Sequence, residues 1–124
     1  MFSSLKTESD REINKSLITE NKNDDLKPKI ITKLIDHKSE INDKTTFICE
    51  YSSFYESRIS WYHNGKAIKQ PQNQNKHIFH NELNRSMITI LNVQLEDSGF
   101  YEFRIQNIYG VSSTAARLTV IQGK

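Results

Sequence analysis

Apolar and polar residues alternate along several short segments of this chain. In residues 46–51, Phe47, Cys49 and Tyr51 fall on one side of an extended backbone and polar or mixed residues on the other. A period of two is typical of a half-buried β-strand. Further short strands are predicted over residues 28–34, 59–61, 66–69, 78–79, 86–93, 101–105 and 116–120. In two of these strands the residues expected to face inward are Ile88, Ile90, Val93, Tyr101, Phe103 and Ile105. Seven or more strands at this spacing favour an all-β sandwich.

Turn residues separate these strands. Pro28 suits an edge strand because it has no amide donor, and the first strand is expected to be split, with Ile30 and Leu34 inward. Asn42 is expected at a turn because asparagine tolerates positive φ. Asn64-Gly65 predicts a tight turn. Residues 107–110 form the next turn, and residues 71–75 are expected to form a loop.

Residues 1–26 differ in composition from the rest. They carry four Lys/Arg and six Asp/Glu, and Phe2 is their one aromatic residue. Such a stretch buries too little apolar surface to offset the entropy of ordering. We expect a polar, disordered tail or linker over residues 1–26, in which residues 9–19 could form a short helix, followed by one domain over residues 27–122.

A spaced set of residues narrows the fold. Cys49 precedes Trp61 by twelve residues, and Asp97, Gly99 and Tyr101 follow in an Asp-x-Gly-x-Tyr sequence. This order is typical of the immunoglobulin-like Greek-key sandwich, in which two antiparallel sheets enclose the core. The usual second cysteine stands two residues after the tyrosine, where this chain has Phe103. With one cysteine, no intradomain disulfide can form.

The chain resembles an intermediate-set (I-set) immunoglobulin domain, of the kind repeated in titin- and twitchin-like muscle and cytoskeletal proteins. The resemblance covers residues 28–122 and includes residues 46–49, 59–62, 64–66, 88–93, 96–101 and 116–120. It implies a non-catalytic structural and protein-interaction module that spaces, tethers or bears load. It also implies a cytoplasmic place in the sarcomere or cytoskeleton, with neighbouring immunoglobulin or fibronectin-like domains as partners. The absent disulfide agrees with a reducing compartment.

Two alternatives remain open. One is an extracellular adhesion or receptor domain that has lost its disulfide. The other is a regulatory module that flanks a kinase in a giant muscle protein. The surrounding sequence of the parent protein would distinguish them, because it would contain a membrane span, a kinase or further repeats.

Several residues have expected structural roles. Trp61 should pack between the sheets against Cys49 and Phe103. Tyr101 should form a tyrosine corner, in which the hydroxyl bonds to nearby backbone. Asp97 and Gly99 should shape the adjoining turn, Asp97 by accepting from amides and Gly99 through its backbone freedom.

Other chemistry is not indicated. The four histidines do not form a set with metal-ligand spacing, so neither a metal nor a cofactor is expected. Cys49 has apolar neighbours and no evident base, so enzymatic activity is not expected. The cations are scattered and no long apolar run occurs, so we expect neither nucleic-acid nor membrane binding. The first residues do not resemble a secretory signal.

Two surfaces are candidate partner contacts. The first is the pole where three loops should meet, which carries Phe54, Tyr55, Leu83, Ile108 and Tyr109. Aromatic loop residues are common contact anchors. The second is an outward strand face, where alternation should place Ile48, Met87 and Leu91 in one apolar patch.

Overall fold

The computed structural model describes residues 25–69 and 75–122. The predicted helix over residues 9–19 and most of the predicted loop over residues 71–75 lie outside the described residues. Within them the elements are β1 (Lys29–Thr32), β2 (His37–Glu40), β3 (Thr45–Ser52), β4 (Arg58–His63), β5 (Lys66–Ala67), β6 (His77–Glu82), β7 (Arg85–Ile90), the 3₁₀ helix η1 (Leu95–Asp97), β8 (Gly99–Asn107) and β9 (Gly110–Ile121).

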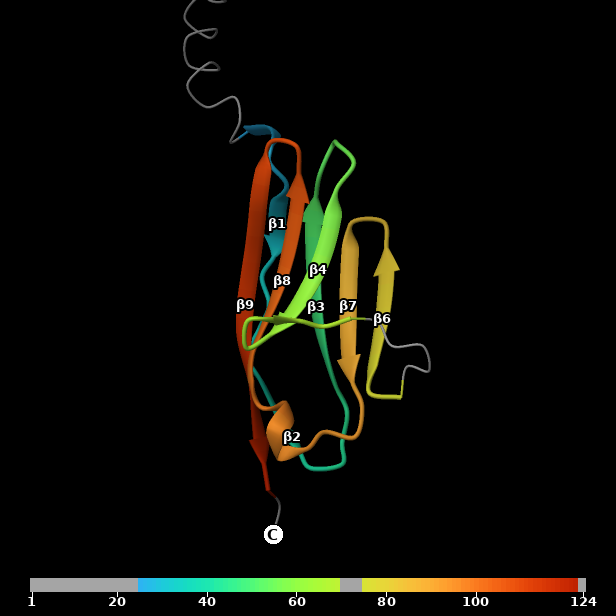
Figure 1. The fold of residues 1–124 in the computed structure, drawn as a ribbon, viewed down its shortest axis with the longest axis vertical. Helices are drawn as coiled ribbons and strands as arrows, with labels where there is room; N and C mark the ends of the chain where they lie inside the picture. The colour runs from blue at the N-terminus through green and yellow to red at the C-terminus, as the bar shows by residue number, and fades with distance from the viewer. Residues whose placement is uncertain (1–24, 70–74, 123–124) are drawn as a thin grey trace, which may run out of the picture.

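The strands form two sheets that pack face to face (Figure 1). One sheet has the order β1-β3-β7-β6 and the other the order β2-β9-β8-β4-β5. Alternating side chains from both inner faces fill the space between the sheets. The predicted all-β sandwich is confirmed, and the one cysteine excludes an intradomain disulfide.

One prediction about the sheets is wrong, because the five-stranded sheet is mixed. Its strand β2 runs parallel to β9, with His37 opposite Leu118. The reason lies in the segment between β1 and β2, where the chain crosses from one sheet to the other without reversing. Buried Leu34 donates its N–H to Thr114 Oγ1 (3.2 Å) at this crossing, and Asp36 Oδ1 accepts from the Arg117 N–H (2.8 Å).

Asparagines shape several turns. Asn42 has a φ of 78°, as predicted, and Asn64, Asn84 and Asn92 also have positive φ. Asn92 explains a second difference from the sequence prediction. The strand expected over residues 86–93 ends at Ile90, because positive φ at Asn92 turns the chain. Val93 nevertheless remains buried in the core.

The core is one cluster between the sheets. It contains Leu34, Phe47, Cys49, Trp61, Ile88, Ile90, Val93, Tyr101, Phe103, Ile105, Ala116 and Leu118. Almost all of these residues were predicted to face inward from the alternation of apolar and polar residues in the sequence. Ile30, Tyr51 and Val120 are partly buried against the same cluster.

Candidate functional site

The structure places Phe103 inside the core, directly opposite Trp61 in the pairing of β4 with β8. Their rings meet edge to face with centroids 5.1 Å apart. Tyr51 stacks against Phe103 with centroids 5.5 Å apart. Cys49 is fully buried in the same cluster. An aromatic ring therefore occupies the position where the usual pattern has the second cysteine.

The indole of Trp61 needs a hydrogen-bond acceptor because it is buried. Its Nε1–H donates to Ser86 Oγ (2.9 Å), and the Ser86 hydroxyl donates to Asn81 Oδ1 (2.6 Å). Neither Ser86 nor Asn81 was predicted from the sequence as a partner. A buried indole predicts an acceptor nearby, but not which strand supplies it.

Burial shifts the pKa values of several side chains in the described residues, Cys49 and His77 among them. Burial, with a smaller contribution from the Glu50 carboxylate, raises the pKa of the Cys49 thiol to about 12. The thiol is therefore protonated at neutral pH, and a protonated thiol is a poor nucleophile. Burial also lowers the pKa of His77; Asp97 opposes this shift, and Lys76 and His63 add to it. The lowered pKa favours the neutral form of His77.

Tyr101 lies near the start of β8, just after the corner that follows η1. Its hydroxyl donates to the Asp97 carbonyl oxygen (2.6 Å), the geometry expected of a tyrosine corner. His63 stacks on its ring with centroids 4.3 Å apart. Gly99 has a φ of 127°, and a side chain there would clash with Asn64, whose Oδ1 accepts from the Phe100 N–H (2.9 Å).

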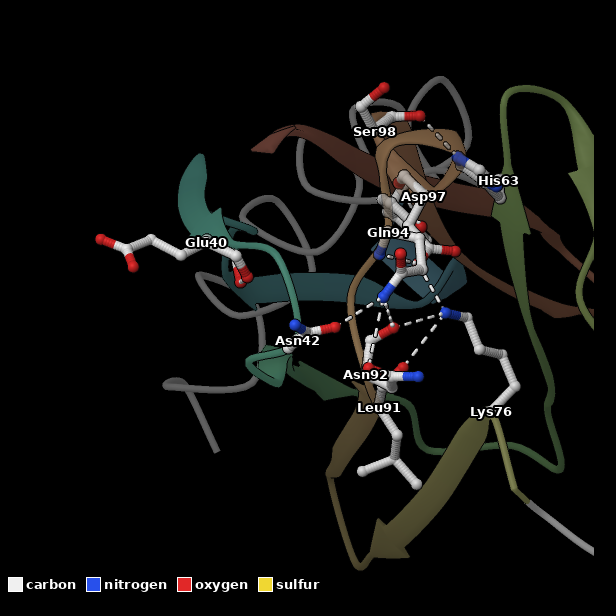
Figure 2. Close-up of polar contacts among 11 residues, drawn as sticks. Glu40, Asn42, His63, Lys76, Leu91, Asn92, Gln94, Asp97 and Ser98 are labelled. Carbon is white, nitrogen blue, oxygen red and sulfur yellow. Dashed lines mark hydrogen bonds and ion pairs between the residues drawn. The ribbon is translucent and has the colours of Figure 1, made fainter. Parts of the chain in front are cut away.

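Asp97 joins the turn at η1 to the segment just before β6 (Figure 2). Its Oδ2 accepts from the Gln94 N–H (2.7 Å), the kind of amide contact that the sequence predicted, and pairs with Lys76 Nζ (2.5 Å). Lys76 also donates to the carbonyl oxygens of Leu91 and Asn92, both at 3.1 Å. Lys76 was not predicted, because nothing local in the sequence indicates a contact between positions 21 residues apart.

The loops that follow β3, β6 and β8 lie toward the same end of the sandwich (Figure 1). Phe54, Leu83 and Ile108 are 88%, 91% and 82% exposed there. Tyr55 and Tyr109 are brought together, with ring centroids 5.1 Å apart. This loop pole therefore carries exposed apolar side chains beside a contacting pair of tyrosines.

The outward face of β3 and β7 carries the second candidate surface. Ile48 lies directly opposite Met87, and the neighbouring strand β6 adds Ile78, which the sequence analysis had not included. Ile48 and Ile78 are 43% and 38% exposed. Leu91 lies just beyond the end of β7 and is half-buried. We call Ile48, Ile78, Met87 and Leu91 the apolar patch.

The described residues contain neither a group of metal ligands nor a membrane-spanning helix. Residues 25–69 and 75–122 contain no group of three or more His, Cys, Asp and Glu side chains that could hold a metal ion. No helix in the same described ranges has the length and apolar character needed to cross a membrane.

Both the fold and the residues of its core define an immunoglobulin-type domain. The family model for the immunoglobulin I-set domain matches residues 28–120, and the chain belongs to that family. The titin homolog of Caenorhabditis elegans is 32% identical over 93 residues, which make up 75% of this chain and 0%, to the nearest percent, of that protein. Vascular endothelial growth factor receptor 2 of Danio rerio is 30% identical over 92 residues, 74% of this chain and 6% of the receptor.

Solved structures show the same fold. A titin M4 domain is 27% identical, with a TM-score of 0.72 over 77% of this chain and 96% of that chain. The twitchin kinase region of C. elegans is 22% identical, with a TM-score of 0.75 over 80% of this chain and 17% of that chain, and this likeness concerns the fold alone. The chain thus spans only a small part of the curated relatives it matches.

Proposed function

We propose that this domain is a non-catalytic structural and protein-interaction module of a larger intracellular protein, of the muscle or cytoskeletal kind. In this role it spaces, tethers or carries load between neighbouring domains. The observation that carries the proposal is the parallel pairing of β2 with β9. Family membership and the similarity to the titin homolog support it.

The parallel pairing matters because of the direction in which force would act. β2 lies near the start of the domain and β9 at its end, and the two strands run the same way. Force on the two ends would pull β2 from its first residue and β9 from its last, so the strands would slide past each other. All hydrogen bonds of the ladder would then be loaded together and would have to break together.

Ser39→Pro is expected to lower the force needed to unfold the domain. The Ile41 N–H donates to the Ile121 carbonyl oxygen (3.2 Å), and alternation places the Ser39 N–H on the same side, toward β9. Proline removes that donor. The measurement is single-molecule pulling on a tandem array of the domain.

Lys38→Pro is the matched control, because the Lys38 N–H points away from β9 by the same alternation. If Lys38→Pro and Ser39→Pro unfold at the same force, the ladder does not bear load. Urea denaturation of both variants separates any difference in equilibrium stability from the mechanical effect.

An extracellular receptor or adhesion domain is the second candidate. The specific observation in its favour is the similarity to the zebrafish growth factor receptor. Cys49 favours the intracellular proposal, because it is a free, buried cysteine in a domain without an intradomain disulfide. Locating the full-length protein in its native cells would decide between the two compartments.

We propose that the domain binds other proteins through the apolar patch and the loop pole. A neighbouring domain is the occupant proposed for the loop pole, because the chain enters there: Asn107 Nδ2 donates to the Leu26 carbonyl oxygen (2.9 Å) beside Tyr109. The occupant proposed for the apolar patch is a partner protein. Side chains of this kind are common at the centre of such contacts.

Met87→Lys is expected to abolish binding through the apolar patch while changing stability by less than about 0.5 kcal/mol, as is usual for surface positions. The measurement is retention of partner proteins on the immobilised domain, together with the melting temperature. Gln122→Lys adds the same charge at an exposed position away from the patch. If Met87→Lys lowers the melting temperature as strongly as it lowers partner retention, Met87 has a role in folding instead.

A further inference from the structure

Three of the four arginines in the described residues lie on one surface. Arg58 in β4, Arg104 in β8 and Arg117 in β9 alternate with the buried residues Trp61, Phe103 and Leu118 of the same strands. They therefore point away from the core, on the outer side of the five-stranded sheet. We call Arg58, Tyr62, Phe100, Arg104 and Arg117 the arginine face.

Aromatic rings hold two of these guanidinium groups. The guanidinium carbon of Arg104 lies 4.3 Å from the centroid of the Tyr62 ring, and that of Arg117 lies 4.7 Å from the centroid of Phe100. Phe100 is directly opposite Arg117 in the sheet and 51% exposed. A guanidinium that is already stacked on a ring loses less conformational entropy when it binds a ligand. The N–H groups in its plane can still donate two hydrogen bonds to a carboxylate.

Acidic side chains on the arginine face offset only part of its charge. Glu102 accepts from Arg104 Nη2 at 3.2 and 3.3 Å, and Asp36 at the margin accepts from the Arg117 backbone N–H. Among the ion pairs within the described ranges, none includes Arg58 or Arg117. The outer face of the other sheet differs, because there Glu82 pairs with both Arg85 and His80.

We propose that the arginine face binds an acidic, extended segment of a partner protein. Arg117 lies beside Phe100 and Arg58 beside Gln106, so the cations are separated by six residue steps along β8. At about 3.4 Å per residue this distance is roughly 20 Å, which suits a short extended segment with carboxylates on alternate residues. Arg58 also lines a groove with Gln106 and Ile108, whose one acidic lining residue is Glu56. The proposal rests on the proposed role as a protein-binding module and names the chemistry of one partner.

The test is the affinity of the full chain for a fluorescein-labelled peptide of alternating Glu and Ser, followed by fluorescence anisotropy at low salt. Arg104→Gln with Arg117→Gln is expected to weaken binding about tenfold, because each exposed ion pair contributes up to several-fold. The pair Lys44→Gln with Lys69→Gln removes the same charge at exposed positions outside the arginine face and should leave binding within about twofold. If the double variant unfolds, the single variant Arg117→Gln, which changes an exposed residue, replaces it in the binding measurement.

Four outcomes would overturn the proposal. Equal weakening by both double variants would mean that only the overall charge of the domain matters. Equal binding of a peptide with Gln in place of Glu would mean that the carboxylates are not recognised. Tighter binding of a single-stranded oligonucleotide of equal charge, lost in the arginine variant, would assign the face to nucleic acid. Self-association that the arginine variant abolishes would assign it to a second copy. None of these outcomes bears on the pulling experiment, which tests the load-bearing role separately.

Discussion

Phe103→Ala is expected to lower the free energy of unfolding by about 3–5 kcal/mol, the range for removing a buried aromatic side chain. Phe103 is fully buried and contacts both Trp61 and Tyr51, so alanine would leave a cavity between the two sheets. Many domains are stable by only about 5–15 kcal/mol, so this loss would take up much of the total. Urea denaturation followed by tryptophan fluorescence measures the change.

Phe54→Ala is the matched control, because it is the same substitution at a side chain that is 88% exposed. It should change stability by less than about 0.5 kcal/mol. Similar losses in the two variants would contradict the role given to Phe103.

Phe103→Cys provides a second measurement at the same position. Under oxidising conditions it should form a disulfide with Cys49 and recover part of the stability, since native disulfides contribute about 2–5 kcal/mol in small domains. In reductant the variant should remain destabilised. Mass spectrometry detects the crosslink, and its absence would show that the two positions do not face each other across the core.

Asp97→Ala should cost about 1–3 kcal/mol, the usual penalty for leaving donors that are at least partly buried without an acceptor. The carboxylate side chain is 8% exposed and accepts from both Gln94 and Lys76. Its loss should also accelerate hydrogen exchange at the Leu91 amide. That amide donates to the Lys76 carbonyl oxygen (2.8 Å), and the contact between Lys76 and Asp97 holds this segment in place.

A double-mutant cycle of Asp97→Ala with Lys76→Met isolates the contact between the two side chains. Lys76→Met alone should cost less, because the Lys76 side chain is 33% exposed. Residues in direct contact usually show coupling of about 0.5–3 kcal/mol. Glu96→Ala, at the exposed neighbouring acid, is the control and should be nearly neutral. A coupling energy near zero would mean that the pair does not stabilise the fold.

Strand alternation allowed the core to be predicted in detail. The inward positions in residues 46–51, 86–90 and 101–105 were identified because successive side chains of a strand point to opposite faces of the sheet. Positive φ at Asn42 was predicted for an equally local reason, since it depends on the conformational tolerance of one residue type. The end of β7 at Ile90 was missed, because Val93 continues the apolar pattern after the chain has turned.

Fewer residues of the candidate sites could be predicted from the sequence. Ile78 completes the apolar patch only because β6 pairs with β7, and Lys76 reaches Asp97 only because their two segments meet at one end of the sandwich. The aromatic stacking within the arginine face was likewise not predicted. Arg104 and Arg117 lie on different strands, and each stacks on an aromatic residue whose position relative to it depends on strand pairing.

The sequence by itself determined which side of each strand is buried, the aromatic residue in place of a second cysteine, and the family of the domain. These features depend on short-range periodicity and on residue identity at a few spaced positions. Only the tertiary structure decided that β2 runs parallel to β9, that Lys76 pairs with Asp97, and that two guanidinium groups stack on rings from neighbouring strands. Such features depend on strand order and register, which bring together residues far apart in the chain and leave no local pattern to read.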